Sequence, residues 1–187
     1  RVINATQING VDGTKIKDLT YAEIEGRRQA KKVIEFLKKY APGFENAYIN
    51  GMPAIVGVRE TRRILGEEYL VADDLLSGRK WDSAVVRGAH FILDIHNPTG
   101  VGQVMGVSEE NPFGRDPNPL PYDIPFECLI PRKLSGLLTA GRCISGSHEA
   151  HSSYRVQQIA MAIGTGAGVG AALAHRKQVD VRRVDAK

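Results

Sequence analysis

The sequence is poor in cysteine. It holds only Cys128 and Cys143 among 187 residues, and they form no CxxC pair. This disfavours a disulfide scaffold, a structural zinc knuckle and an iron–sulfur cluster held by this chain alone. Because disulfides persist mainly in oxidising compartments, we expect a reducing, cytoplasmic location. A chain of this length can bury a core without such cross-links.

Long hydrophobic runs and a signal sequence are also missing. The most apolar stretch, residues 159–174, carries four glycines and is shorter than the roughly 20 mostly apolar residues of a membrane span. We interpret it as a buried helix and expect no membrane partner. The first residue is Arg1 rather than Met, and residues 2–8 have the pattern of a strand. We therefore expect a piece of a longer chain.

Charge of one sign is only in slight excess, with 25 basic and 21 acidic residues, a net charge of +4 and a pI of about 9.1. Part of the excess lies in the last segment, at residues 175–177 and 182–183. Basic residues interleaved with aromatic ones are typical of nucleic-acid binding, and no such stripe is present. We therefore expect no nucleic-acid partner.

The clearest secondary-structure pattern predicts an amphipathic helix over residues 20–40. Thr20 is a suitable N-cap, and Glu23 three residues later completes a capping box. Apolar residues then recur at helical spacing, at Ile24, Val33, Ile34, Leu37 and Tyr40.

Shorter patterns predict further elements along the chain. Asp73 and Asp74 indicate the start of a short helix at residues 75–79, and residues 84–96 read as extended. Proline-rich residues 97–125 predict a long irregular loop, which in a compact domain is usually functional. The remaining predictions are strands at residues 54–58, 126–130 and 137–140, and a helix at 154–175 capped by Ser152 or Ser153.

Residues 137–175 combine a strand, a Gly-Arg turn, a polar loop and a helix. A helix N-terminus has unpaired N–H groups and a positive dipole end, so it suits an anionic or electron-rich ligand edge. Each of the four helical glycines costs about 1 kcal/mol relative to alanine. We therefore expect close packing of this helix on a sheet. The run GAGVGA at residues 166–171 has dinucleotide-fingerprint spacing, but too little chain follows it for a βαβ unit.

Several short motifs occur in an order that resembles the FAD-dependent oxidoreductase family. The resemblance covers nearly the whole chain and extends to flavoproteins of the heterodisulfide-reductase and fumarate-reductase types. It implies FAD as cofactor and a flavin-mediated reaction, with the glycine-rich nucleotide-binding half lying N-terminal to this part. The motifs are TYAEIEGR (20–27), GVRETRRI (57–64), DIH (94–96), YDIP (122–125), AGRCIS (140–145), His148 and SYRV (153–156).

The resemblance also implies which residues lie along the cofactor. The backbone N–H groups of Arg155 and Val156 are expected at the N1/O2 edge of the flavin, where the reduced ring carries negative charge. The full cofactor-binding set comprises Gly141, Arg142, Ser145, Ser153, Arg155 and Val156.

A second group of polar residues, which also includes Arg63 and Asp94, could line the substrate side. Arginine can bind a carboxylate with two hydrogen bonds, and histidine can move protons near neutral pH. Ion pairing of the arginines with neighbouring glutamates is an open alternative. The candidate catalytic residues are Arg59, Arg62, His96, His148 and His151.

We therefore expect an α/β (α+β) chain in two parts. Residues 1–125 would form a mixed-sheet substrate lobe, and residues 126–187 would complete an FAD-binding domain together with the missing N-terminal half. A small-molecule substrate and a possible homo-oligomer complete these expectations.

Two other functions remain open. One is a non-catalytic substrate or assembly module without flavin. The other is a zinc hydrolase built from Asp94, His96, His148 and His151. The zinc interpretation is disfavoured because His148 and His151 are three residues apart, whereas the HExxH motif places them four apart, so we expect no metal.

Overall fold

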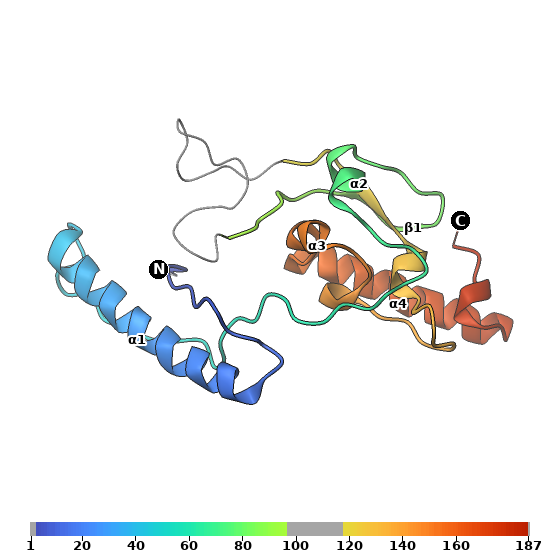
Figure 1. Cartoon of the computed structure of the whole chain (residues 1–187). Helices are drawn as coiled ribbons and strands as arrows, with labels where there is room; N and C mark the ends of the chain where they lie inside the picture. The colour runs from blue at the N-terminus through green and yellow to red at the C-terminus, as the bar shows by residue number, and fades with distance from the viewer. Residues whose placement is uncertain (1–2, 97–117, 187) are drawn as a thin grey trace. The chain divides into compact units, whose positions relative to one another are not determined.

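The computed structural model describes residues 3–96 and 118–186. The chain divides into two compact units, Arg1–Thr61 and Arg62–Lys187. The helices α1–α4 and a small antiparallel sheet give a mixed α/β architecture, which confirms the α+β class (Figure 1). The unit boundary lies at Thr61, whereas the predicted functional division after residue 125 stays a prediction.

The first unit is built on one long helix, α1 (Ile16–Tyr40). It confirms the predicted helix but begins earlier, so Thr20 lies inside it and its hydroxyl donates to the Ile16 carbonyl at 2.9 Å. The predicted capping box is therefore wrong. The N-cap residue is Lys15, which makes no side-chain cap, and Glu23 instead pairs with Arg27.

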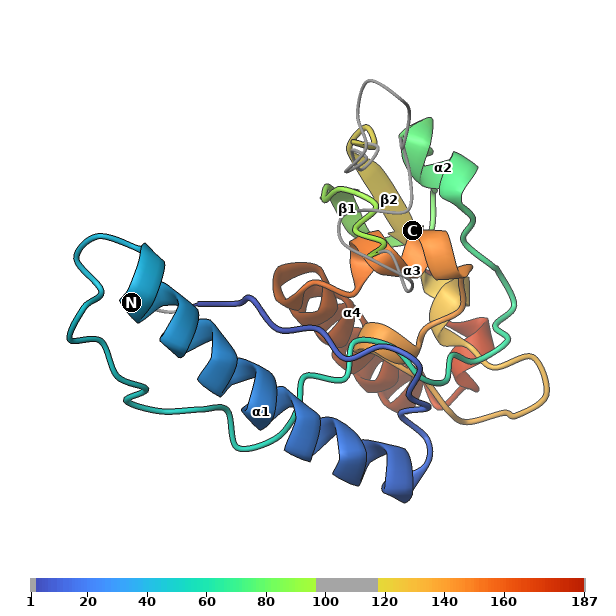
Figure 2. The same ribbon diagram turned by 60° about the vertical axis from the view of Figure 1, so that its left-hand side comes forward.

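Extended segments accompany α1 within the first unit (Figure 2). The Gln7 N–H donates to the Gln29 side chain at 3.1 Å, and the Val56 N–H donates to the Glu23 carboxylate. Neither segment forms a strand among the described residues, although residues 2–8 and 54–58 have strand-like patterns. They differ from the prediction because polar side chains of α1 accept the N–H groups of Gln7 and Val56, where a strand would bond to a neighbouring strand.

The second unit contains a two-stranded antiparallel sheet of β1 (Ala84–Ala89) and β2 (Tyr122–Pro125). Every residue of β2 is buried, including Asp123. The Asp123 carboxylate is satisfied by the Gly88 N–H at 2.9 Å and the Lys80 ammonium at 3.3 Å. Buried charge is tolerated where it is paired in this way.

The long helix α4 (Gln157–Lys177) packs on this sheet through bare backbone. A Cβ atom on Gly166 would lie 2.7 Å from Val85 Cβ, and one on Gly170 would lie 2.6 Å from the Phe126 ring. Gly166 and Gly170 are four residues apart and share a helix face. The expected close packing is thus confirmed for these two glycines, whereas Gly164 and Gly168 face open space.

Two predicted strands are replaced by other structure. Residues 126–129 form the short 3₁₀ helix η1 (Phe126–Leu129). The Phe126 N–H donates to the Ser83 carbonyl, and the chain turns directly after this hydrogen bond. Residues 137–140 stay extended, with Thr139 donating to Leu129 O at 2.8 Å, but they form no strand among the described residues.

The remaining predictions fare differently. The short helix α2 (Ala72–Leu76) overlaps the predicted one, with Asp74 inside it rather than before it. Of the predicted loop, residues 97–117 lie outside the described residues, and its last residues form β2. Two further 3₁₀ turns are η2 (Gly141–Cys143) and η3 (Val181–Arg183).

The predicted helix at 154–175 is in fact two helices. α3 (His148–Tyr154) and α4 meet at 93°, and the break falls at Arg155 and Val156. No single helix among the described residues is long and apolar enough to cross a membrane, and only this bent pair passes that test together. Ser152 and Ser153 lie buried inside α3, so their prediction as N-caps is wrong.

The true cap of α3 is Ser147, whose hydroxyl accepts the Ala150 N–H at 3.2 Å. We expect Ser147→Ala to lower the free energy of unfolding by about 1 kcal/mol, because an orphan N–H loses its acceptor. Thr20→Ala should cause no such loss, since Thr20 lies within α1 and caps nothing. Denaturant unfolding of the two variants compares them directly. Equal losses would contradict the cap assignment.

Candidate functional site

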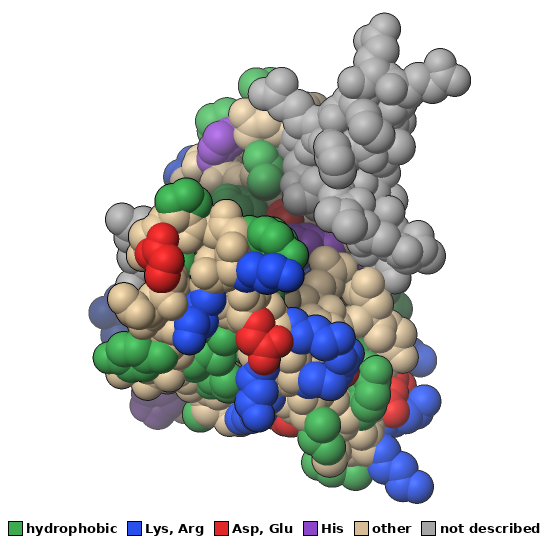
Figure 3. Space-filling view, turned by 90° about the vertical axis from the view of Figure 1, so that its left-hand side faces the viewer, with side chains coloured by type: hydrophobic (Ala, Val, Ile, Leu, Met, Phe, Trp, Pro, Cys, Tyr) green, Lys and Arg blue, Asp and Glu red, His purple; other side chains and the backbone are tan. Residues whose placement is uncertain are grey.

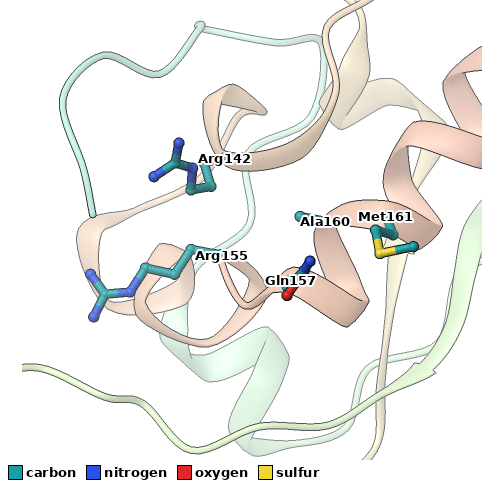
Figure 4. A pocket seen from close by; sticks show the side chains of 5 residues that line it. All are labelled: Arg142, Arg155, Gln157, Ala160 and Met161. Carbon is teal, nitrogen blue, oxygen red and sulfur yellow. The ribbon is translucent and has the colours of Figure 1, made fainter. Parts of the chain in front are cut away.

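An open pocket of about 440 Å³ lies in the second unit, beside the start of α4. Its volume is within the range of small-molecule sites, about 300–1,000 Å³. Figure 4 shows its lining, with one arginine from η2, a second at the helix break and three residues from α4. The lining residues are Arg142, Arg155, Gln157, Ala160 and Met161.

The turn that places Arg142 depends on Gly141. Its φ of +74° lies in the left-handed region, which favours glycine. The turn carries the predicted AGR motif into the wall of the pocket, so Gly141 shapes the backbone and Arg142 supplies the charge.

The N-terminus of α4 adds to the positive character of this pocket. Val156 is the N-cap and provides no side-chain acceptor, and the N–H groups of Gln157 and Gln158 make no hydrogen bond among the described residues. The Arg155 N–H, in contrast, donates to His151 O at 3.0 Å and is used within α3. The Arg155 N–H is therefore engaged, and the backbone donors without an acceptor among the described residues begin at Val156, the second residue of the predicted pair.

The Arg155 side chain is held by Asp94. One guanidinium nitrogen, Nη2, lies 2.6 Å from the Asp94 carbonyl oxygen and 3.4 Å from its carboxylate oxygen Oδ2. The other carboxylate oxygen lies 2.9 Å from His96 Nε2. Asp94 thus connects a predicted catalytic histidine with a predicted cofactor-binding arginine.

His151 is fully buried beneath these arginines. Burial lowers the pKa of its imidazole to about 4, helped by the positive charges of Arg155 and Arg63 and opposed by a hydrogen bond to the Arg142 backbone. Its ring meets Tyr154 edge-on, with centroids 5.3 Å apart. The imidazole is therefore neutral at physiological pH, and its predicted catalytic role stays a prediction.

Three other predicted catalytic residues are exposed. His148 is the exposed first residue of α3, and Arg62 is exposed at the start of the second unit. Arg59 belongs to the first unit, where it is exposed. Within residues 3–96 and 118–186, no group of three or more His, Cys, Asp or Glu side chains could hold a metal ion. The zinc set is therefore not assembled there.

Two serines of the predicted cofactor set are buried. The Ser153 hydroxyl donates to Phe91 O at 2.6 Å and lies 2.9 Å from the Tyr122 hydroxyl, so it is engaged in the fold. The Ser145 hydroxyl is fully buried and has no hydrogen-bond partner among the described residues. Such an orphan group is uncommon in a core and costs free energy unless a partner is supplied.

Three lining residues are not among the predicted site residues: Gln157, Ala160 and Met161. They follow from the break between α3 and α4, because a helix starting at Gln157 turns these positions toward Arg142 and Arg155. The predicted continuous helix over residues 154–175 contains no helix start at Gln157. No residue type in this stretch marks the break.

Comparison with known proteins gives one match. A model of the family described as FAD dependent oxidoreductase matches residues 1–187. Searches of curated proteins and of solved structures return no match.

Proposed function

Because the chain belongs to the FAD-dependent oxidoreductase family, we propose that it forms the C-terminal part of a flavoenzyme that oxidises or reduces a small organic substrate. The observation that carries this proposal is the positively charged pocket at the start of α4, in a chain matched along its full length. Family membership supports flavin-mediated redox chemistry in general.

The residues of the pocket fit one edge of a flavin. Arg142, Arg155 and the first N–H groups of α4 would hold the pyrimidine edge of the ring, where negative charge develops on reduction. The orphan Ser145 hydroxyl is a further polar group of the same AGRCIS segment. When bound, the flavin supplies the hydride-accepting chemistry that side chains lack.

The described residues do not provide a cradle for the diphosphate of FAD. The GAGVGA run lies in the middle of α4, with helix on both sides, so it does not form the strand–turn–helix of a dinucleotide fingerprint. We propose, on the family resemblance, that a separate N-terminal half binds this part of the cofactor. Flavoproteins of the heterodisulfide-reductase type, and more widely those of the fumarate-reductase type, are proposed relatives. A cytoplasmic location and a possible homo-oligomer are also proposed.

On the substrate side, we propose that Arg62 binds an acidic group while His96 and His148 exchange protons. Arg59, in the first unit, is a separate candidate for binding an acidic group. Both arginines are exposed, and His148 is exposed at the start of α3. His151 is the weakest member of the set, because its buried imidazole is already neutral and its low pKa opposes proton uptake near pH 7.

The decisive measurement is the visible absorbance of the purified full-length protein, with and without added FAD. We expect bound flavin, and Arg155→Gln should make its reduction less favourable by about 1–2 kcal/mol, because a cation near the reduced ring is lost. Potentiometric titration measures this change. Arg176→Gln is the matched control, since it removes the same charge from the exposed last turn of α4.

The outcomes separate the candidate functions. Absence of flavin after addition of FAD would favour a non-catalytic substrate or assembly module. Bound flavin with the same potential in Arg155→Gln and in the wild type would remove Arg155 from the cofactor edge while leaving the oxidoreductase proposal intact.

A further inference from the structure

We propose that Asp94 is a positioning residue that holds the Arg155 guanidinium at the pocket and anchors His96 beside it. Neither the family match nor the motif resemblance assigns this positioning role to Asp94. The inference rests on the proposed function, because it concerns how the cation is fixed next to the flavin edge.

Asp94 is the rigid member of this group because its backbone is fixed on both sides. Leu93 is fully buried in the core, and the Phe91 carbonyl accepts the Ser153 hydroxyl at 2.6 Å. Two tight turns follow in succession, in which Asp94 N–H donates to Ile92 O and Ile95 N–H to Leu93 O, both at 3.0 Å. The segment is therefore pinned to α3 and to the core.

Arg155 is the member that needs to be positioned. Its long side chain has several rotatable bonds, and about 2 kcal/mol of rotamer entropy favours its movement into solvent. The Asp94 carbonyl and carboxylate both bind the same Nη2 atom, and only 11% of the Arg155 side chain and 18% of the Asp94 side chain are exposed. Charge-assisted bonds in such a partly buried place are stronger than exposed ones.

The second carboxylate oxygen gives Asp94 a further effect. It lies 2.9 Å from His96 Nε2, so the carboxylate also orients this imidazole ring. A proton-exchanging group and the cation at the flavin edge are thereby joined through one carboxylate. Loss of the Asp94 carboxylate therefore frees His96 from this contact and removes the charge partner of Arg155, which keeps its bond to the backbone carbonyl.

The test uses the sign of a change in redox potential in the flavin-containing full-length protein. Removing a negative charge near the flavin would by itself raise the potential. If the Asp94 carboxylate positions Arg155, however, Asp94→Ala leaves only the bond to the backbone carbonyl. The guanidinium is then held less firmly at the pocket, and the potential falls toward that of Arg155→Gln. We expect a roughly tenfold loss in the reduction equilibrium, about 30 mV for a two-electron couple.

Further variants make the result specific. Asp94→Ala should add nothing in an Arg155→Gln background, and Asp94→Glu should restore most of the wild-type potential. Asp73→Asn is the matched control, because it removes the same charge from an exposed position in α2. Asp94→Asn replaces Asp94→Ala if circular dichroism shows that the alanine variant does not fold.

Each outcome decides the question. A raised or unchanged potential in Asp94→Ala, together with a lowered one in Arg155→Gln, overturns the role of Asp94 and leaves the proposed function standing. An unchanged potential in Arg155→Gln shows that the cation is not at the flavin and overturns the inference through its premise. A protein that binds no flavin overturns both proposals.

Discussion

Gly166→Ala is expected to destabilise the second unit, whereas Gly168→Ala, two residues further along the same helix, is expected to stabilise it. The added Cβ of Gly166→Ala would lie 2.7 Å from Val85 Cβ and 3.3 Å from both of its γ-carbons. A β-carbon is fixed to the backbone, so β1 and α4 would have to move apart. Overpacking of this kind costs about 1–3 kcal/mol.

Helix propensity, in contrast to overpacking, favours the alanine variant at both positions. Alanine is favoured over glycine in a helix by up to about 1 kcal/mol. For Gly166→Ala this gain only reduces the loss, and we expect a net decrease of roughly 1–2 kcal/mol. For Gly168→Ala nothing lies within 4 Å of the added carbon, so the full gain should be seen.

Denaturant unfolding of the two variants at equal protein concentration measures the difference. Gly164 gives a second control, because it also faces open space. If Gly166→Ala were as stabilising as the two controls, α4 would not pack on β1 through its backbone. Figure 3 shows one face of the molecule, on which hydrophobic side chains are interspersed with lysines, arginines and acidic residues.

The glycine helix shows what the sequence could predict about the fold. Four glycines within a helical pattern indicate close packing, and Gly166 and Gly170 confirm it. Periodicity likewise predicts α1, and the run of apolar and small residues at 159–174 predicts α4. The α+β class follows from these helices together with the short extended runs.

Helix boundaries were harder to predict because they depend on local hydrogen bonds. Thr20 and Ser153 both have the residue type of an N-cap, yet both lie inside helices. Their hydroxyls bind carbonyl oxygens instead, of Ile16 and Phe91. Serine and threonine can bond backbone groups in either way, so residue type alone does not distinguish a cap from an interior position.

The site was predictable only in part. Arg142 of the AGR turn and Arg155 line one pocket, while their place along the cofactor stays a prediction. The DIH motif includes Asp94 and His96, but the contact of Asp94 with Arg155 joins residues 61 positions apart in the sequence. Such a pairing needs the fold, since nothing in the spacing of either motif indicates it.

Lowering the pH from neutral to about 4.5 is expected to cost the second unit about 2–3 kcal/mol of stability through His151. Burial lowers the pKa of this imidazole from 6.5 to about 4. The unfolded chain therefore takes up a proton as the pH falls below 6.5, while the folded chain does not until about pH 4. Stability is unaffected above this window, falls within it and levels off below it.

The window distinguishes His151 from the carboxylates. The pKa of Asp12 and that of Glu25 are lowered to about 2 by hydrogen bonds from Thr14 and Arg28. Their contributions are fully present above the ordinary carboxyl pKa and are lost only at lower pH. Loss of stability between about pH 6.5 and 4.5 should therefore come mainly from buried histidine.

His151→Gln provides the direct test, because it keeps a polar side chain of similar size but cannot take up the proton. Unfolding free energies across this window should become nearly independent of pH in that variant, even if its stability at neutral pH is lower. His175→Gln, at an exposed position near the end of α4, should keep the wild-type slope. If the His151→Gln slope equalled that of the wild type, the imidazole would have to be protonated in the fold. A buried cation next to Arg63 and Arg155 would then be repelled by both, so the arginines would have to lie further away than the structure places them.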